Sequence, residues 1–304
     1  MNLTSAFNKS LALIALVSLL PSPSHGETSY SWLVFNIPPF GSIHGEGIGF
    51  ELANAYIKAD LKNAIVITNP ARWQQEMLDA SNEKFCVTGS WKLPNTQHRI
   101  YSESIVNTVD YGVAVTPELY KKISNHGKTR VVSIVDVIQA TKTSGHLVKL
   151  DGRPVFGEMN TLIIQGQLQE GVKIDDMVAP EGPISMLKVA NHTNRNVDSV
   201  LIFPEEFVVF SKENPNHSLE YLMLQEGTSF APIRASCPDT QEGRLIIKKI
   251  NELLNTGLRS KILQSFQNAL PNIHEIREQA KLNQACIQDY SCKDPLIDLK
   301  TPRL

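Results

Sequence analysis

Residues 85–105 read FCVTGSWKLPNTQHRIYSESI, and this stretch decides the fold. It opens with the apolar run Phe85-Cys86-Val87, which is typical of a buried strand in a parallel sheet. Arg99 follows shortly after the end of that strand. An arginine placed there can bind a carboxylate through two parallel hydrogen bonds, and open α/β sheets bind ligands beyond the carboxyl ends of their strands. Arg99 is therefore a candidate ligand-binding residue, and the alternative is a surface arginine that pairs locally.

Strand and helix patterns alternate around this stretch. Strands are expected at residues 31–37 and 64–68, and amphipathic helices at residues 50–59 and 71–80. With the strand that begins at Phe85, this order predicts a parallel sheet with right-handed crossovers.

The pattern restarts after a strand at residues 111–116. Helices are expected at residues 134–140, 158–168, 183–190 and 205–210, and apolar strands at residues 172–174 and 197–203. The chain returns through a strand at residues 221–225 and ends in helices at residues 240–254 and 257–270. An α/β fold of two lobes is therefore predicted.

Composition limits the function. The chain has 304 residues, of which 42% are hydrophobic and 20% are charged, so it can bury a sizeable core. Its formal charge of −2, without a basic cluster among aromatics, excludes nucleic acid and anionic membrane surfaces as expected partners.

The N-terminus has the features of a signal peptide. Lys9 gives a positive start, residues 10–20 (SLALIALVSLL) are apolar, and residues 21–26 (PSPSHG) suit cleavage after Gly26. The alternative is an uncleaved anchor, although the apolar run is short for a membrane span. We therefore expect an exported chain.

Four cysteines are candidates for disulfides in an exported chain: Cys86, Cys237, Cys286 and Cys292. Four cysteines allow three pairings. The last two are close in sequence and could close a small loop, which leaves a long-range pair between the first two; the alternative for that pair is two buried thiols. Because no Cys or His cluster has metal spacing, we expect no metal and no cofactor.

The order of several short motifs resembles that of bacterial extracellular solute-binding protein family 3, receptors best known for polar amino acids. The motifs are Pro38-Pro39-Phe40, residues 47–54 (GIGFELAN), Thr96-Gln97-His98-Arg99, Tyr101-Ser102, residues 197–200 (VDSV), and Gly243 with Ile250-Asn251. The resemblance implies a type II periplasmic-binding fold, each lobe a mostly parallel sheet flanked by helices. Residues 27–114 and 222–304 would form the first lobe and residues 115–221 the second, after a signal peptide at residues 1–26.

The resemblance also implies a ligand site in the cleft between two lobes that close by hinge motion at strands 111–116 and 221–225. Arg99 would hold the carboxylate of the ligand. The helix that begins near Gly157 and Asn160 would offer backbone N–H groups to the same carboxylate.

Three positions depart from the family pattern. Phe203 stands where the receptors place an aspartate for the ligand's ammonium, Ile37 stands where they place an aromatic, and Trp91 stands where they place a small hydroxyl residue. A carboxylate without a free ammonium, or a more apolar ligand stacked on Trp91, therefore fits better than an ordinary amino acid.

Other side chains are weaker candidates. Arg72 begins a helix near a strand end and could face the cleft, or it could be a solvated first-turn residue. Phe40 and Trp91 could be cleft walls or core anchors. We expect Glu205 and Glu206 to be a solvated helix start, where negative charge is favoured.

The predicted function is a non-enzymatic periplasmic receptor, expected as a monomer, that presents a small carboxylate ligand to an ABC transporter or a sensor kinase. Two alternatives remain open. The first is a degenerate interaction module without a small ligand. The second is a cleft enzyme such as a dehydratase, for which His98 and Glu103 are the nearest acid–base candidates by sequence.

Overall fold

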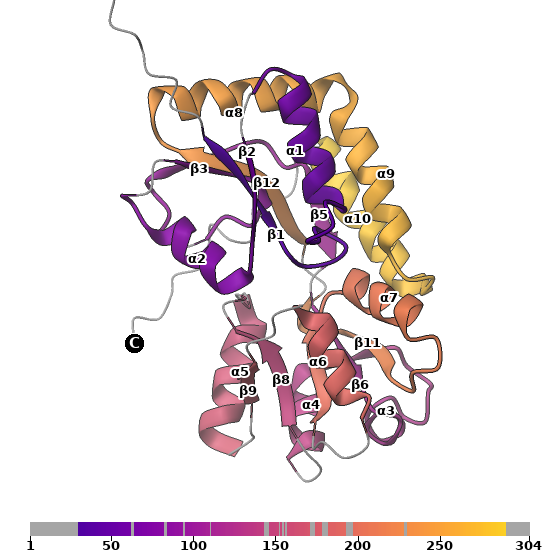
Figure 1. Cartoon of the computed structure of the whole chain (residues 1–304). Coiled ribbons are helices and arrows are strands. Elements are labelled where there is room, and N and C mark those ends of the chain that lie inside the picture. The colour runs from indigo at the N-terminus through magenta and orange to yellow at the C-terminus, as the bar shows by residue number, and fades with distance from the viewer. Residues whose placement is uncertain are drawn as a thin grey trace, which may run out of the picture.

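The computed structural model describes the chain from residue 30 to residue 289, except for residues 62–63, 82–83, 94, 110, 143–145, 152, 154, 156, 171–173, 178–181, 193–196 and 228–229. It shows two lobes, each built around one six-stranded sheet with helices packed on it (Figure 1). The expected signal peptide, residues 1–26, lies outside the described residues.

Lobe I contains the sheet with strand order β2-β1-β3-β12-β4, in which β5 also pairs with β12. Strands β1, β2 and β3 are parallel, while β12 runs antiparallel to β3, β4 and β5. Its elements are β1 (Ser31–Phe35), α1 (Ile48–Lys58), β2 (Ala64–Thr68), α2 (Pro70–Leu78), β3 (Phe85–Ser90), β4 (Arg99–Tyr101), β5 (Val106–Val109), β12 (Phe230–Pro238), α8 (Gln241–Leu253), a π-helical segment η2 (Leu254–Leu258), α9 (Arg259–Ala269) and α10 (His274–Asp289).

The register of lobe I fixes which edge faces the other lobe. Ser31 of β1 pairs with Phe85 of β3, so the two strands start at the same edge of the sheet. Both then run toward lobe II, and β1 leads directly into the loop of residues 36–47. The carboxyl ends of these parallel strands therefore lie at the boundary between the lobes, as expected for a ligand site.

Lobe II contains the sheet with strand order β7-β11-β6-β10-β8-β9. Strand β6 runs antiparallel to both of its neighbours, β11 and β10, whereas the outer pairs are parallel. Its elements are β6 (Gly112–Val115), α3 (Pro117–Ile123), β7 (Val131–Val132), α4 (Ile134–Thr141), β8 (His146–Leu150), α5 (Gly157–Glu170), β9 (Ile174–Met177), α6 (Pro183–Ala190), β10 (Val197–Ile202), α7 (Pro204–Glu213) and β11 (Glu220–Leu224).

The chain crosses between the lobes twice. The first crossing joins β5 of lobe I to β6 of lobe II, and the second joins β11 of lobe II, through the 3₁₀ turn η1 (Gln225–Gly227), to β12 of lobe I. The expected lobe boundaries at 114/115 and 221/222 fall within β6 and β11. Both strands belong to the sheet of lobe II and pair with each other.

The two-lobed α/β fold with mostly parallel sheets is confirmed, and each sheet is mixed because one strand, β12 in lobe I and β6 in lobe II, runs against the other five. The antiparallel strands are those that enter from the other lobe, since such a strand needs no helical crossover. Sequence patterns missed β4, β5, α3, β7, β8, β12 and α10. Most of these are short elements, and β12 and α10 carry polar residues that obscure their periodicity.

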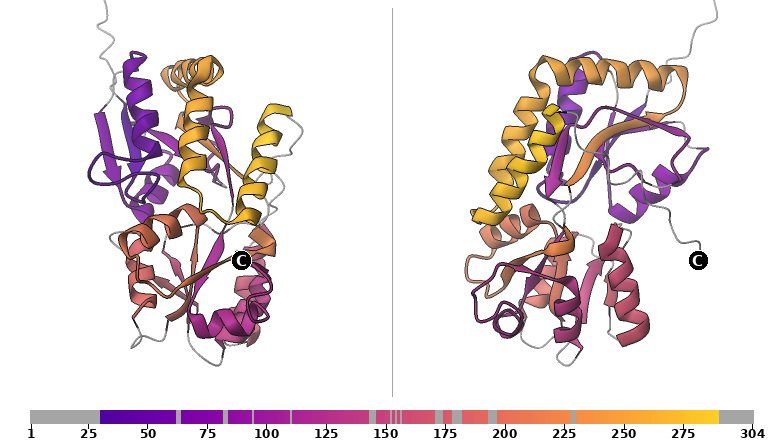
Figure 2. Two further views of the ribbon diagram at one scale, coloured as in Figure 1. Left: turned by 90° about the vertical axis from the view of Figure 1, so that its right-hand side faces the viewer. Right: turned by 180° about the vertical axis from the view of Figure 1, so that it is seen from behind.

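The C-terminal helices α8, α9 and α10 all pack on lobe I (Figure 2). Helix α10 is held on β5 by side-chain amides of both elements, which donate hydrogen bonds to backbone carbonyls of the other element. Asn107 Nδ2 donates to the carbonyl of Asn283 at 2.7 Å, and Gln284 Nε2 donates to the carbonyl of Asn107 at 2.6 Å. These hydrogen bonds fix helix α10 on β5, the strand of lobe I that leads into the first crossing.

Candidate functional site

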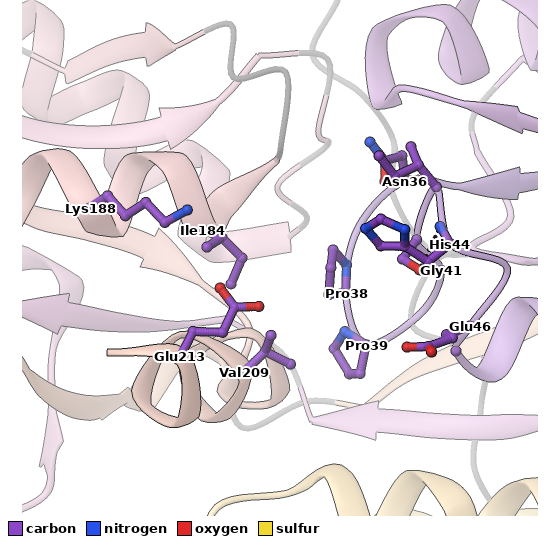
Figure 3. Close-up of a pocket in the computed structure, with 13 residues that line it drawn as sticks. Asn36, Pro38, Pro39, Gly41, His44, Glu46, Ile184, Lys188, Val209 and Glu213 are labelled. Carbon is purple, nitrogen blue, oxygen red and sulfur yellow. Dashed lines mark hydrogen bonds between the residues drawn. The ribbon is translucent and has the colours of Figure 1, made fainter. Parts of the chain in front are cut away.

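A cavity of about 510 Å³ lies between the two lobes. Lobe I contributes the loop of residues 36–47, and lobe II contributes Ile184 and Lys188 of α6 and Val209 and Glu213 of α7. Figure 3 shows the two sets of side chains facing each other across the opening. Because ligand sites form preferentially at interfaces between domains, this cavity is the candidate functional site.

The loop of residues 36–47 is held in place by its own backbone. The N–H groups of Phe40 and Gly41 donate to the carbonyl of Ile37 at 2.8 and 3.0 Å, and Gly49 donates to the carbonyl of Phe40 at 2.6 Å. A Cβ on Gly41 would lie 2.1 Å from the carbonyl oxygen of Phe35, so only glycine fits there. These bonds and the close approach at Gly41 give the loop a defined turn.

Charged groups of both signs line the cavity. His44 and Glu46 lie on the lobe I side, and Lys188 and Glu213 lie on the lobe II side (Figure 3). All four side chains are exposed. The cavity therefore offers polar contacts to a ligand from both lobes.

An aromatic cluster of Phe40, Trp91, Tyr111 and Phe203 joins the lobes beside this cavity. The ring of Phe203, from lobe II, stacks on Tyr111 at 4.2 Å between ring centres and on Trp91 of lobe I at 5.4 Å. Phe40 meets the same ring edge-on at 6.4 Å. Three of the predicted site residues are thus brought together, and Phe203 at 1% exposure fills the space between them.

A buried ion pair lies behind Phe203. Arg153 donates from Nη1 and Nη2 to the two carboxylate oxygens of Glu206, at 2.8 and 2.5 Å, and its guanidinium lies 5.0 Å from the centre of the Phe203 ring. Glu206 also accepts the backbone N–H of Phe203 at 2.9 Å. Burial lowers the pKa of Arg153, but the charge and hydrogen bonds of Glu206, together with Tyr111 and Glu205, outweigh it and raise that pKa above its ordinary value.

Glu205, the neighbour of this pair, is completely buried. Neither of its carboxylate oxygens has a hydrogen-bond partner in the described part of the chain. Burial raises the pKa of Glu205 to about 8, and the charge of Glu206 adds to the effect. The expectation that Glu205 and Glu206 form a solvated helix start is therefore wrong, because both side chains are fully buried and Glu206 pairs with Arg153.

Arg99 does not lie at the cleft. Its Nη2 donates to the carbonyls of Phe85 at 2.8 Å and Ser236 at 3.3 Å, and its Nε donates to the hydroxyl of Ser236 at 3.3 Å. Phe85 is the first residue of β3, at the end of the strand away from lobe II. The guanidinium is thus a buried link between β3, β4 and β12, and burial lowers its pKa to about 10.

The remaining expected ligand residues lie outside the cavity and the aromatic cluster. Arg72 is exposed on α2 and pairs with Glu76, four residues on, at 3.5 Å. Gly157 is the first residue of α5, whose N-terminal end points toward lobe I (Figure 1), and Asn160 is exposed. None of these residues lines the cavity.

The long-range disulfide is confirmed. Cys86 of β3 bonds to Cys237 of β12. The expected bond between Cys286 and Cys292 stays a prediction. Cys292 lies outside the described residues, and the structure does not describe the side chain of Cys286.

The acid–base candidates of the enzyme alternative are engaged elsewhere. His98 Nε2 contacts the carbonyl of Met77 at 3.0 Å, and Glu103 pairs with Arg259 at 2.8 Å. Within the described ranges, no group of three or more His, Cys, Asp or Glu side chains is placed to hold a metal ion.

Sequence reasoning named none of the residues that line the cavity as site residues. It also missed Arg153, Tyr111, Glu205 and Glu206 beside the cavity. Arg153 lies in a segment without periodicity, so no pattern placed it next to α7. The available signal was the apolar strand that leads into Phe203-Pro204, because it implies that the following helix starts inside the protein.

No protein-family model and no curated protein matches the sequence. Solved structures do match. The ligand-binding core of GluR0 in complex with L-glutamate is 13% identical with a TM-score of 0.56, over 80% of this chain and 98% of that chain. AbpA, an amino acid ABC transporter substrate-binding protein from Streptococcus pneumoniae bound to L-arginine, is 12% identical with a TM-score of 0.54, over 80% and 96%. A histidine kinase sensor domain with similarity to periplasmic binding proteins is 10% identical with a TM-score of 0.54, over 81% and 96%.

The chain therefore has the two-lobed type II fold of periplasmic solute-binding proteins. The resemblance found in the sequence motifs is confirmed at the level of the fold. Among the helices described, none is long and apolar enough to cross a bilayer.

Proposed function

We propose that this chain is an exported, non-enzymatic receptor that binds a small solute between its two lobes. The observation that carries the proposal is the cavity of about 510 Å³, because residues of both lobes line it. Its size lies within the range of about 300–1,000 Å³ that is usual for small-molecule sites. A ligand that contacts both walls would favour the closed arrangement of the lobes.

The charges of the cavity support a carboxylate-bearing or amino-acid-like ligand. Lys188 offers a cation on the lobe II wall, while Glu46 and Glu213 offer carboxylates on opposite walls. A zwitterion can contact groups of both signs. Lys188 therefore takes the role that the sequence assigned to Arg99.

Two partners suit such a receptor, an ABC transporter or a membrane sensor. The similar structures include one protein of each kind, which supports the choice without deciding it. An exported chain places the receptor in the periplasm, and we expect it to work there as a monomer.

The test is a melting screen of the full mature chain against amino acids, dicarboxylates and short peptides. A ligand at a hundred times its dissociation constant should stabilise the protein by about 2.7 kcal/mol. Lys188→Met should raise the dissociation constant of the ligand at least tenfold. Lys212→Met, which replaces an exposed lysine of α7 outside the cavity, should leave that constant unchanged. Equal responses of the two variants would show that the ligand binds elsewhere.

A second candidate function is a protein-interaction module without a small ligand. The stacking of Phe203 between Tyr111 and Trp91 favours it, because the chain's own side chain fills part of the space between the lobes. The absence of any melting shift across the panel, together with a closed arrangement in the unliganded protein, would favour this candidate.

A further inference from the structure

Helix α7 turns one face toward the other lobe. Val209 and Glu213 of this helix line the cavity together with Pro38 and Pro39 of lobe I. Residues four apart lie on the same face of a helix, so Glu205, one turn before Val209, continues this stripe. Glu205 thus lies in the first turn of α7, two residues after Phe203, whose ring packs on Trp91 of the other lobe.

The carboxyl group of Glu205 is in an unusual position. It is 0% exposed, and neither of its oxygens meets a donor in the described part of the chain. The nearest cation, Arg153, gives both terminal nitrogens to Glu206. An ionised carboxylate without a partner is very costly in such a place, whereas the protonated group is tolerated.

We propose that closure of the lobes binds a proton at Glu205, so that acidity favours the closed arrangement. When the lobes separate, the stripe of α7 that faces lobe I meets water, and the carboxyl group can lose its proton there. When they close, the group is dehydrated beside the Arg153–Glu206 pair and takes the proton back. This inference does not depend on the proposed ligand, since it concerns the unliganded chain.

The size of the effect follows from linkage. The raised pKa of Glu205, about 8 in the closed state against an ordinary value of 4.5, supports the direction. Below the ordinary value both arrangements hold the proton, so pH has no effect. Between the two values, each pH unit upward lowers the ratio of closed to open protein by up to about tenfold, and the dependence ends above the closed-state value.

Other charged groups near α7 have to be separated from Glu205. Glu206 and Arg153 neutralise each other, and Lys188 and Glu213 are exposed at the cavity. His217 contacts Phe207 and Phe210 from outside the cavity, and burial lowers its pKa. His44 and Glu46 lie across the cavity. Helix α9 packs on α7 and carries two cations: Arg259, which pairs with Glu103, and the exposed Lys261.

The experiment measures the radius of gyration of the unliganded mature chain by X-ray scattering from about pH 5 to about pH 9. The wild type should expand as pH rises. Glu205→Gln, which mimics the protonated group, should stay compact throughout. The matched variant Glu213→Gln, on the same helix face but exposed, and the variants His44→Gln and His217→Asn should expand like the wild type.

A second measurement uses the wild type alone and so does not depend on the folding of any variant. Infrared difference spectra should show a protonated carboxyl band that disappears over the same pH interval as the expansion. A wild-type radius that does not change with pH would overturn the proposal. So would an unchanged pH dependence in Glu205→Gln, or its loss in either histidine variant.

Discussion

At the scale of single residues, Arg99 shows how an interior arginine can be structural. Its guanidinium binds the carbonyls of Phe85 and Ser236, which belong to strands on different parts of the chain. The bond to Ser236 is buried and the bond to Phe85 is partly buried, so water is a poor substitute for the lost donor. The side chain therefore stabilises lobe I and does not contact the cavity.

Arg99→Ala should lower the free energy of unfolding by about 3 kcal/mol, because it removes charged hydrogen bonds and leaves buried carbonyls without donors. Urea denaturation measures this loss. Arg72→Ala, which removes an exposed arginine with only a helical ion pair, should change stability by at most about 0.5 kcal/mol. A ligand that loses binding in Arg99→Ala at temperatures where this variant stays folded would contradict the structural role.

The same residues show what the sequence can and cannot predict about a site. Phe40, Trp91 and Phe203 were each proposed as ligand-site residues, and the structure brings their rings together, since strand order brings strand ends together. The side chain of Arg99 was expected to point into the cleft. It does not, because Arg99 is the first residue of β4, a strand that was not recognised in the sequence. The partner of Glu206 could not be predicted, since Arg153 comes from an irregular segment fifty-three residues away.

At the scale of elements, the disulfide joins two strands that are adjacent in the sheet but 151 residues apart in the sequence. Cys86 lies in the first segment of lobe I and Cys237 in the segment that returns from lobe II. The bond thus closes a loop that contains the whole of lobe II. Long loops are those in which a disulfide restricts the unfolded chain most.

Replacing both cysteines by alanine should lower the free energy of unfolding by about 3–5 kcal/mol. Guanidinium unfolding with and without a reducing agent measures the effect. The reducing agent should destabilise the wild type by a similar amount and leave the variant nearly unchanged. A wild type whose stability does not respond to reduction would show that Cys86 and Cys237 are not bonded in solution.

Elements with clear periodicity were predicted well, and the errors have a common physical origin. Apolar runs identified β1, β2, β3, β10 and β11, because buried strands are nearly continuous hydrophobic segments. Whether a strand is parallel or antiparallel depends on the strands beside it. Strand β12 reaches β3, β4 and β5 only after the chain has crossed back from lobe II. The mixed character of both sheets therefore could not be read from local pattern.

At the scale of the whole molecule, Phe203 makes a buried aromatic contact between the lobes, in addition to the packing of α9 on α7. Its ring meets Trp91 and Phe40 of lobe I, and it is almost fully buried. Aromatic pairs of this kind contribute about 0.5–1.5 kcal/mol beyond the area they bury. Together they favour the closed arrangement without any bound solute.

Phe203→Ala should therefore open the unliganded protein, which X-ray scattering would detect as a larger radius of gyration. The fluorescence of Trp91 should change at the same time, because it loses its stacking partner. Phe210→Ala is the matched control, since Phe210 is equally buried but packs within lobe II against Phe207 and His217. A compact Phe203→Ala protein would mean that other contacts keep the lobes together.

Strand β12 also determines the order in which the molecule can be completed during synthesis. It lies between β3 on one side and β4 and β5 on the other, so lobe I has no continuous sheet until residues 230–238 have left the ribosome. Lobe II is one uninterrupted segment, and all of its strands are available earlier. Its contacts are closer in sequence, which favours faster folding. Strands β1 to β3 and strands β4 and β5 of lobe I are therefore synthesised early but stay unconnected until β12 is made. Lobe II, which is synthesised later, can complete its sheet first.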